Sequence, residues 1–217
     1  QKLQFARIRL TRNEWQEQPV HIDSSNTAVK LTVSTINTED NPEYTPPPGI
    51  ARITDEGGNI VKETSLKLNF SDIHPGDTAL VKNVLVNQSI NLSAYTTMTM
   101  FVHGDPQLNP EDLQYFFRFG NDDSTYYEYR TRLYTSTEDI NKPNQFWDKR
   151  NTMNINLHEF STWKLAAIMS NNKPGLDFSE PINGGEQYFS IKYRNNRPPN
   201  FAGITWMAIG VMRGGTK

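Results

Sequence analysis

The sequence contains no cysteine, no long apolar run and no excess of charge of either sign. Without cysteine, the chain has no disulfides, no thiolate metal ligands and no cysteine nucleophile. Its 22 Lys+Arg residues against 24 Asp+Glu residues give a net charge of −2, which provides no basic footprint for nucleic acid. The longest apolar run, Trp206–Met212, has seven residues, whereas a membrane-spanning helix needs roughly 20. We therefore expect no nucleic-acid partner and no direct insertion of this segment into a membrane.

The sequence also lacks the common signatures of catalysis and of metal binding. It has no Gly-x-Ser-x-Gly motif and no phosphate-binding glycine loop. Two acid pairs, Asp122-Asp123 and Asp72 with Asp77, could bind calcium through carboxylates, but neighbouring acids in turns are more often turn formers. The histidines are far apart and have no metal-ligand spacing: His21, His74, His103 and His158. We therefore predict a protein that is not an enzyme, with no catalytic residue, no cofactor and no metal ion.

Alternation of apolar and polar residues with a period of two predicts strands through most of the chain. The segment Gly120–Ser124 is rich in turn-forming residues and separates two such stretches, which predicts a hairpin. The predicted strands are Phe5–Leu10, Val29–Ser34, Leu66–Phe70, Ala79–Val86, Thr97–Val102, Gln114–Phe119, Tyr126–Tyr134, Gln187–Tyr193 and Thr205–Met212. The residues expected in the core are Leu68, Phe101, Phe117, Tyr129, Ile209 and Val211.

Three segments depart from this pattern. Apolar residues at helical spacing predict a short helix near Glu159–Met169. The proline-rich segment Asn41–Gly58 and the polar segment Ser136–Thr152 are predicted to be long loops. The sequence therefore predicts an all-β fold, a two-sheet β-sandwich of jelly-roll type with one short helix. Residues 1–217 are expected to form a single β-sandwich domain, a fragment of a much larger chain.

One predicted strand is rich in tyrosine, and its alternation assigns its side chains to two faces. Tyr127 and Tyr129 are predicted to face the core, whereas Tyr126, Glu128 and Arg130 are predicted to lie on the outer sheet surface. There Glu128 is expected to meet Arg118 or Arg130, in local pairing or docking and not in acid catalysis. Together with Trp147, the three residues on that surface are the candidate contacts for a partner or a sugar.

Several strings, in order along the chain, carry a resemblance to a known family. They are Phe5–Leu10, Ile36–Asn41, Tyr44, Pro47–Ile50, Glu63–Leu66, Met100–His103, Phe117–Asp122, Tyr126–Tyr129, Phe146-Trp147 and Met207–Val211. They resemble motifs of the SprA/Sov family, among them a Pro-Pro-Gly loop, a Met-Phe-Val-His strand, an Arg-x-Gly-x-Asp turn and a Tyr-Tyr-Glu-Tyr strand. The sequence departs from the family at Asp40, at Asp148-Lys149 and at Arg130–Arg132. These departures indicate a divergent member or a different branch.

The resemblance implies a role in protein secretion. Proteins of the SprA/Sov family form the large outer-membrane β-barrel of the type IX secretion system, through which folded cargo reaches the cell surface, in work linked to gliding motility. The resemblance therefore implies a non-catalytic soluble domain of this translocon, which scaffolds or docks during secretion. Such a domain would be associated with the outer membrane, on the cell surface or the periplasmic face. Its partners would be other parts of the same translocon chain, its partner subunits and secreted cargo proteins.

A carbohydrate-binding module of a secreted glycan-degrading enzyme is the alternative, because both classes use a sandwich fold. An exposed platform of two or three coplanar aromatic rings would distinguish it.

An inserted domain must leave its host and return to it, so its ends tend to lie close together. We therefore expect Phe5–Leu10 and Thr205–Met212 to lie near one another at one edge of the sandwich. The loops Asn41–Gly58 and Ser136–Thr152 are then presented to cargo or partner subunits.

Overall fold

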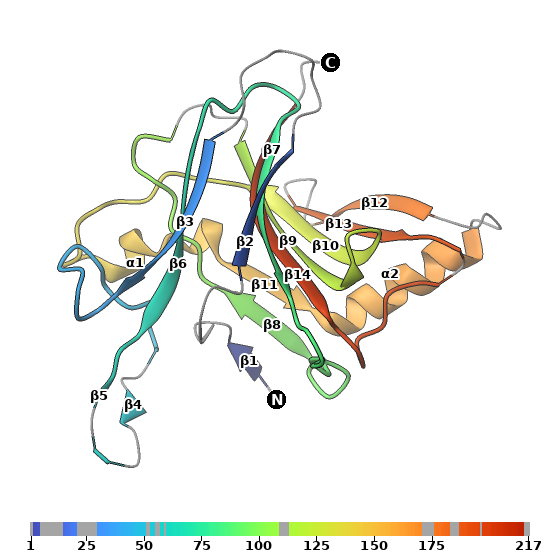
Figure 1. Cartoon of the computed structure of the whole chain (residues 1–217), viewed down its shortest axis with the longest axis horizontal. Helices are drawn as coiled ribbons and strands as arrows, with labels where there is room; N and C mark the ends of the chain where they lie inside the picture. Colours follow the sequence, from blue (N-terminus) through green and yellow to red (C-terminus); the bar gives the residue numbers. More distant parts are fainter. Residues whose placement is uncertain are drawn as a thin grey trace.

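The computed structural model describes residues 2–4, 15–20, 30–50, 53–54, 57–58, 60–108, 113–170, 176–182, 187–195 and 197–214. In this part of the chain the fold is mostly β, built mainly from antiparallel strand pairs, with few helices (Figure 1). The largest sheet has seven strands in the spatial order β12 (Leu176–Ile182), β13 (Gln187–Tyr193), β10 (Thr125–Arg132), β9 (Leu113–Asp122), β14 (Trp206–Arg213), β7 (Thr78–Val84) and β2 (Trp15–Val20). All of its neighbouring strands are antiparallel.

Smaller sheets and short helices surround the large sheet within the described residues. One sheet has the order β1 (Lys2–Gln4), β8 (Thr97–Met100) and β11 (Met153–Asn156), and two pairs are β3 (Lys30–Asn37) with β6 (Thr64–Ser71) and β4 (Ile53–Thr54) with β5 (Ile60–Val61). The helical segments are α1 (Pro143–Phe146), a 3₁₀ turn (Lys149–Asn151) and α2 (Leu157–Ser170). None of the helices described is long and apolar enough to cross a membrane.

The hairpin of β9 and β10 lies near the middle of the large sheet. Its turn is fixed by Asp122, whose Oδ1 accepts hydrogen bonds from the amide of Ser124 at 2.8 Å and from its hydroxyl at 2.7 Å. The pairing register shifts between Thr125 and Tyr126, which marks a bulge beside the turn. The hairpin predicted from the sequence is confirmed, with each strand a few residues different in length.

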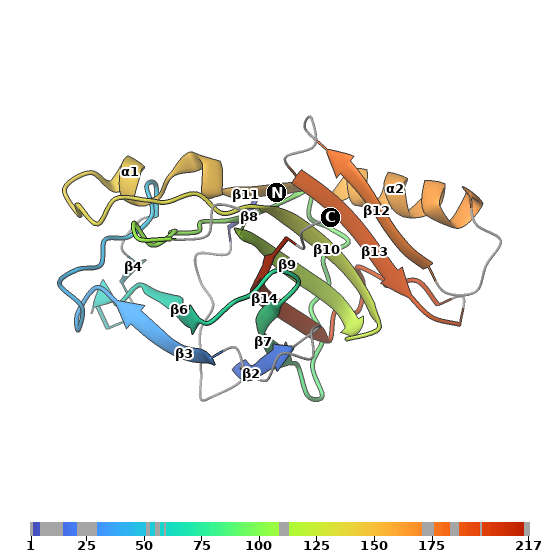
Figure 2. The ribbon, with the colours of Figure 1, turned by 90° about the horizontal axis from the view of Figure 1, so that it is seen from above.

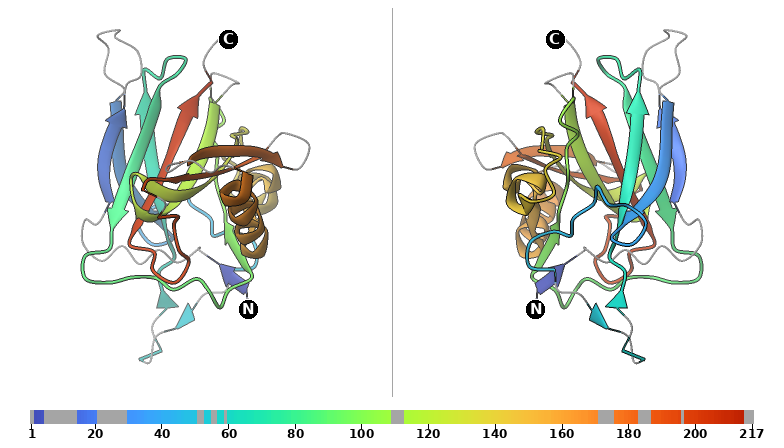
Figure 3. Two further views of the ribbon diagram at one scale, coloured as in Figure 1. Left: turned by 90° about the vertical axis from the view of Figure 1, so that its right-hand side faces the viewer. Right: turned by 90° about the vertical axis from the view of Figure 1, so that its left-hand side faces the viewer.

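One face of the seven-stranded sheet, which carries Tyr127, Tyr129 and Phe189, packs on the main hydrophobic core. We call it the first face. Helix α2 contributes to this core because Leu157, Phe160 and Ala167 repeat at helical spacing and are each at most 2% exposed. The ring of Phe160 lies 4.4 Å from the ring of Phe189 and 6.0 Å from that of Tyr127, centroid to centroid. In Figure 2, α2 runs beside β12 and β13. In the left view of Figure 3, β2 and β3 stand on the side of the molecule away from α2.

The second face of the same sheet carries a smaller cluster of its own. Its buried members are each at most 8% exposed: Leu80, Phe116, Tyr126, Trp206 and Ala208. Strand pairing places these residues on the face opposite to Tyr127 and Tyr129. The middle of the sheet is therefore buried on both sides, which the alternation of the sequence does not predict.

The helix and most of the strands were predicted close to their observed positions. The predicted helix near Glu159–Met169 is α2, and Gln187–Tyr193 is β13. The core prediction is correct for Phe117, Tyr129 and Val211. It is wrong for the half-buried Leu68, Phe101 and Ile209, which pack against the margin of a cluster and are not enclosed by it.

Two expectations about the architecture are wrong. Thr205–Met212 was placed at an edge, but β14 lies inside the sheet with β9 on one side and β7 on the other. The predicted loop Ser136–Thr152 contains α1 and the 3₁₀ turn, so α2 is not the single helix of the described chain. The predicted strand Phe5–Leu10, Val29 and His21 lie outside the described residues. The jelly-roll connectivity and the single domain stay predictions.

Gly210 allows β14 to pass directly under the ring of Phe116. A Cβ atom at Gly210 would lie 2.3 Å from the carbonyl oxygen of Ala79 and 2.7 Å from Cζ of Phe116. We expect Gly210→Ala to lower the free energy of unfolding by about 1–3 kcal/mol, as overpacking does, measured by guanidinium chloride denaturation. Gly203→Ala is the control, because a Cβ atom there meets nothing within 4 Å. Equal losses in both variants would contradict the close packing under Phe116.

Candidate functional site

Glu128 stands between two arginines on the second face of the large sheet. Strand register sets it directly opposite Arg118 of β9, and Arg130 follows two residues along β10 on the same face. Arg118 Nε donates to Glu128 Oε2 at 2.6 Å, and Arg130 Nη1 lies 3.6 Å from Oε1. The Glu128 side chain is 5% exposed, and those of Arg118 and Arg130 are 17% and 23% exposed. We call these three residues the arginine–glutamate triad.

Aromatic rings hold the two guanidinium groups over the sheet. The Arg118 guanidinium lies 4.2 Å from the ring centroid of Phe116 and 5.1 Å from that of Tyr126. The Arg130 guanidinium lies 4.8 Å from the ring of Tyr188. Such contacts are favourable because the ring face is negative and the cation is partly desolvated. The arginine side chains thus cover the apolar residues beneath them while their charged ends meet the carboxylate of Glu128.

The triad carries an unequal number of charges. Two guanidinium groups face one carboxylate, and Arg118 makes the shorter contact with it. Arg130 Nε is buried and has no hydrogen-bond partner. The triad is therefore one carboxylate short of neutrality.

A second cluster joins the two segments that the sequence predicts as long loops. Trp147 Nε1 donates to the carbonyl oxygen of Thr45 at 2.8 Å. The Trp147 ring makes edge-to-face contacts with Tyr44 at 6.1 Å and with Phe101 at 6.3 Å. We call this cluster the loop junction, formed by Tyr44, Glu63, Ser65, Phe101, His103, Phe146 and Trp147. The two loops pack on each other here, whereas we expected both to be presented to cargo or partners.

Tyr44 carries the polar half of the loop junction. Its hydroxyl donates to the Glu63 carboxylate and lies 2.7 Å from Ser65 Oγ. Burial raises the pKa of Tyr44 above its usual range, and the neighbouring Glu63 raises it further. Burial also raises the pKa of Glu63, against the hydrogen bond from Tyr44, which lowers it. Glu63 Oε1 is buried without a hydrogen-bond partner, so this carboxyl group is held in a place that disfavours its charged form.

His103 completes the loop junction, and a proline-glycine turn lies in the same loop as Tyr44 and Thr45. His103 Nδ1 lies 2.8 Å from the carbonyl oxygen of Phe146, and because a carbonyl only accepts, Nδ1 carries the hydrogen. The two rings also stack at 4.2 Å. The amide of Ile50 donates to the carbonyl of Pro47 at 3.1 Å, with Gly49 at φ +81°, as a type II turn requires. His103 therefore holds the backbone and the ring of Phe146 in the loop junction.

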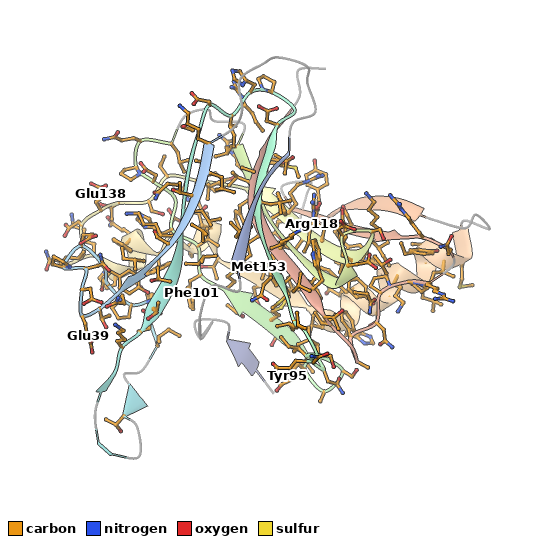
Figure 4. The ribbon with its side chains drawn as sticks, viewed as in Figure 1. Glu39, Tyr95, Phe101, Arg118, Glu138 and Met153 are labelled. Carbon is orange, nitrogen blue, oxygen red and sulfur yellow. The ribbon has the colours of Figure 1, made fainter. Side chains whose placement is uncertain are left out.

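The structure brings together three of the four candidate contact residues. Tyr126, Glu128 and Arg130 share the second face, whereas Trp147 belongs to the loop junction. The predicted pairing of Glu128 with arginine is confirmed. Glu128 lies on the face opposite the main core, as predicted, but its carboxylate is buried there under guanidinium groups and aromatic rings, while Arg118 and Arg130 keep part of their side chains exposed. In Figure 4, Arg118 is labelled on the right of the view and Phe101 on the left, and the two clusters share no residue.

The aromatic residues of these clusters do not form the platform expected of a sugar-binding module. Tyr126, Trp147 and Trp206 are buried. The rings of Tyr126 and Trp206 are tilted by 32° to each other. These rings are packed inside their clusters and are not open to stack on a sugar.

The acid pairs considered for calcium bind neighbouring protein groups. Asp122 closes the hairpin turn on Ser124, and the buried Asp77 accepts from the amide of His74 at 2.9 Å. The Oδ2 atom of Asp72 lies 3.4 Å from Nζ of Lys30, in a salt bridge. Within the described residues, no group of three or more His, Asp and Glu side chains is placed to hold a metal ion.

The loop junction was missed as a site by sequence reasoning. Tyr44 and Glu63 are 19 residues apart, and Trp147 and Thr45 are 102 apart. A signal was present in the strings that carry the family resemblance, because they meet in space. Those that meet at the loop junction are Ile36–Asn41, Tyr44, Glu63–Leu66, Met100–His103 and Phe146-Trp147. The strings Phe117–Asp122, Tyr126–Tyr129 and Met207–Val211 meet in β9, β10 and β14.

Glu128→Gln should destabilise the domain, because it leaves two arginines without their carboxylate. Breaking a buried ion pair by removing one partner costs about 3–5 kcal/mol. The partial exposure of Arg118 and Arg130 places the expected loss at the lower end, about 3 kcal/mol. Chemical denaturation measures the loss, with the exposed Glu138→Gln as control. An unfolding free energy equal to that of the control would show that Glu128 does not hold the arginines.

Glu63→Gln should change how stability depends on pH. Because the folded protein raises the pKa of Glu63, the contribution of this group is fully present below its unfolded pKa and is lost as pH rises through the folded pKa. Gln keeps an acceptor for Tyr44 and cannot ionise. We therefore expect the melting temperature of Glu63→Gln, relative to the unchanged protein, to increase from about pH 4 to pH 8. A difference that stays constant, as expected for Glu138→Gln, would contradict a desolvated carboxyl at Glu63.

Comparison with known proteins assigns the chain to a family. The family model SprA_N, described as motility related/secretion protein, matches residues 1–195 of the 217. None of the curated proteins compared with the chain matches it. The resemblance carried by the ordered strings is therefore confirmed over nine-tenths of the sequence. The chain belongs to the SprA family of motility-related secretion proteins.

Proposed function

We propose that this protein is a non-catalytic soluble domain of a type IX outer-membrane translocon, which scaffolds or docks during protein secretion and gliding motility. It acts at the outer membrane, on the cell surface or the periplasmic face. Its partners are other parts of the translocon chain and the subunits bound to it, and secreted cargo can contact it. The membership of the chain in a motility and secretion family supports this proposal.

The observation that supports it most is the convergence of the family-like strings on two packed clusters. At the loop junction, residues from two loops bury aromatic rings against one another and use a side-chain donor for a backbone carbonyl. Loops that are fixed in this way form a surface of constant shape. A constant shape suits docking, because little loop entropy is lost when a partner binds.

The chemistry of the two clusters favours a structural role over catalysis. Glu128 accepts from Arg118 and faces Arg130, so its lone pairs are engaged by arginines. His103 directs its Nδ1 proton to a backbone carbonyl. The carbohydrate-binding alternative gains no support, since the aromatic residues that it needs are buried. For the described antiparallel sheets, we propose the finer architecture of a jelly-roll sandwich.

Trp147→Ala in the full-length channel tests the proposal. The change removes the indole between the two loops and the donor to Thr45, and truncating a buried Trp costs about 3–5 kcal/mol. We expect protein secretion and gliding to fall several-fold, measured alongside the amount of channel in the outer membrane so that loss of the channel itself is recognised. Lys149→Ala, at an exposed neighbouring position, should change neither. A channel without residues 1–217 that secretes and glides normally would overturn the proposal.

A further inference from the structure

The second face of the seven-stranded sheet concentrates positive charge in a protein whose net charge is −2. Strand register places five basic residues on this face: Lys82, Arg118, Arg130, Arg132 and Lys192. Glu128 is the acidic residue at the centre, while Asp122 lies at the hairpin turn and Asp177 stands opposite Lys192 on the edge strand β12. The positive charge is therefore greatest over the central strands, where it attracts an acidic partner.

Within this face, Arg130 is partly buried and has only distant acceptors. Its Nη1 lies 3.6 Å from Glu128 Oε1 and 3.6 Å from the sulfur of Met212, and its Nε has no partner. A guanidinium group has five N–H donors. Arg118, in contrast, holds the shared carboxylate at 2.6 Å. The arrangement offers Arg130 a ring to lie on, Tyr188, but no carboxylate of its own.

We infer that this face docks an acidic segment of a protein partner, and that a carboxylate of that segment pairs with Arg130. A planar carboxylate matches the fork of a guanidinium group, which a single neutral acceptor does not. The second carboxylate turns the triad into a neutral group of four. Lys82 and Lys192, both half-buried, flank the site and steer the acidic segment toward it. The half-buried ring of Tyr188 provides apolar contact beside the charge.

This inference deepens the proposed docking role by giving the chemistry of one partner. It concerns the second face and does not involve the loop junction. A binding test on the purified 217-residue protein therefore stands apart from the secretion test on Trp147. Failure of the peptide to bind would overturn this inference and leave the proposed docking role, tested through Trp147, intact.

The test uses a fluorescein-labelled peptide of alternating Asp and Gly, with fluorescence anisotropy as the measurement at low ionic strength. We expect saturable binding that weakens as salt is added, and no binding of a matched peptide with Asn in place of Asp. Arg130→Gln should weaken binding at least about tenfold. Lys82→Gln should weaken it about two- to threefold and chiefly slow association, as rim charges do.

Two control variants distinguish pairing with the guanidinium group of Arg130 from general charge attraction. Lys67→Gln removes the same charge from an exposed position on β6, outside this face, and should leave the affinity unchanged. Arg130→Lys keeps the charge but loses the fork, so it should bind more weakly than the unchanged protein if Arg130 grips a carboxylate. Circular dichroism of each variant shows whether it is folded, and Lys82→Gln provides the answer if Arg130→Gln is not.

Three results would overturn the inference. The first is no saturable binding of the acidic peptide. The second is equal weakening by Lys67→Gln and Lys82→Gln, which would reveal general charge attraction. The third is tighter binding of a sulfated oligosaccharide than of the peptide through the same residues, which would identify a site for polyanionic glycans.

Discussion

The ion pair between Arg118 and Glu128 sets the register on which the large sheet depends. A carboxylate taken out of water is costly unless a cation meets it, and the two residues face each other directly across β9 and β10. A slip of one residue would move Glu128 onto the first face, among the rings of the main core. The paired side chains therefore oppose any other alignment of the hairpin. Strand β14 joins β9 in the matching register, and its glycine and alanine leave room for the aromatic rings of the second face.

The sequence was enough to assign residues to faces but not to say how deeply each face is buried. Alternation separates Tyr127 from Glu128 correctly, and helical spacing finds α2. Whether the second face lies in water depends on side chains from other strands, and the period of one strand cannot contain that information. Strands β2 and β12 escaped prediction for a different reason. Each contains a proline, Pro19 or Pro181, and proline in a strand argues for an edge, which is where both lie.

The loop junction shows why contacts between loops escape prediction from a sequence pattern. A buried loop must satisfy its backbone polar groups without a neighbouring strand. Here the donor for Thr45 comes from Trp147, and the carbonyl of Phe146 is met by His103. Neither pairing leaves a periodic signal, because each joins segments that are far apart along the chain. The strings that resemble the SprA family contain these residues, but their order along the chain does not reveal which of them meet.

The two clusters differ in how completely their polar groups are satisfied, and that difference bears on what each can do. At the loop junction, the hydroxyl of Tyr44 and the indole of Trp147 both have acceptors within the domain, so the loops are fixed without a partner. On the second face, Arg130 keeps a buried donor without an acceptor. An unsatisfied buried donor costs about 1–3 kcal/mol. A partner that supplies a carboxylate balances the excess positive charge of the two arginines over Glu128 and gains the attraction of the surrounding charges. The free energy of such docking therefore comes in part from relieving a deficit already present in the free domain, and the same deficit disfavours partners that bring no negative charge.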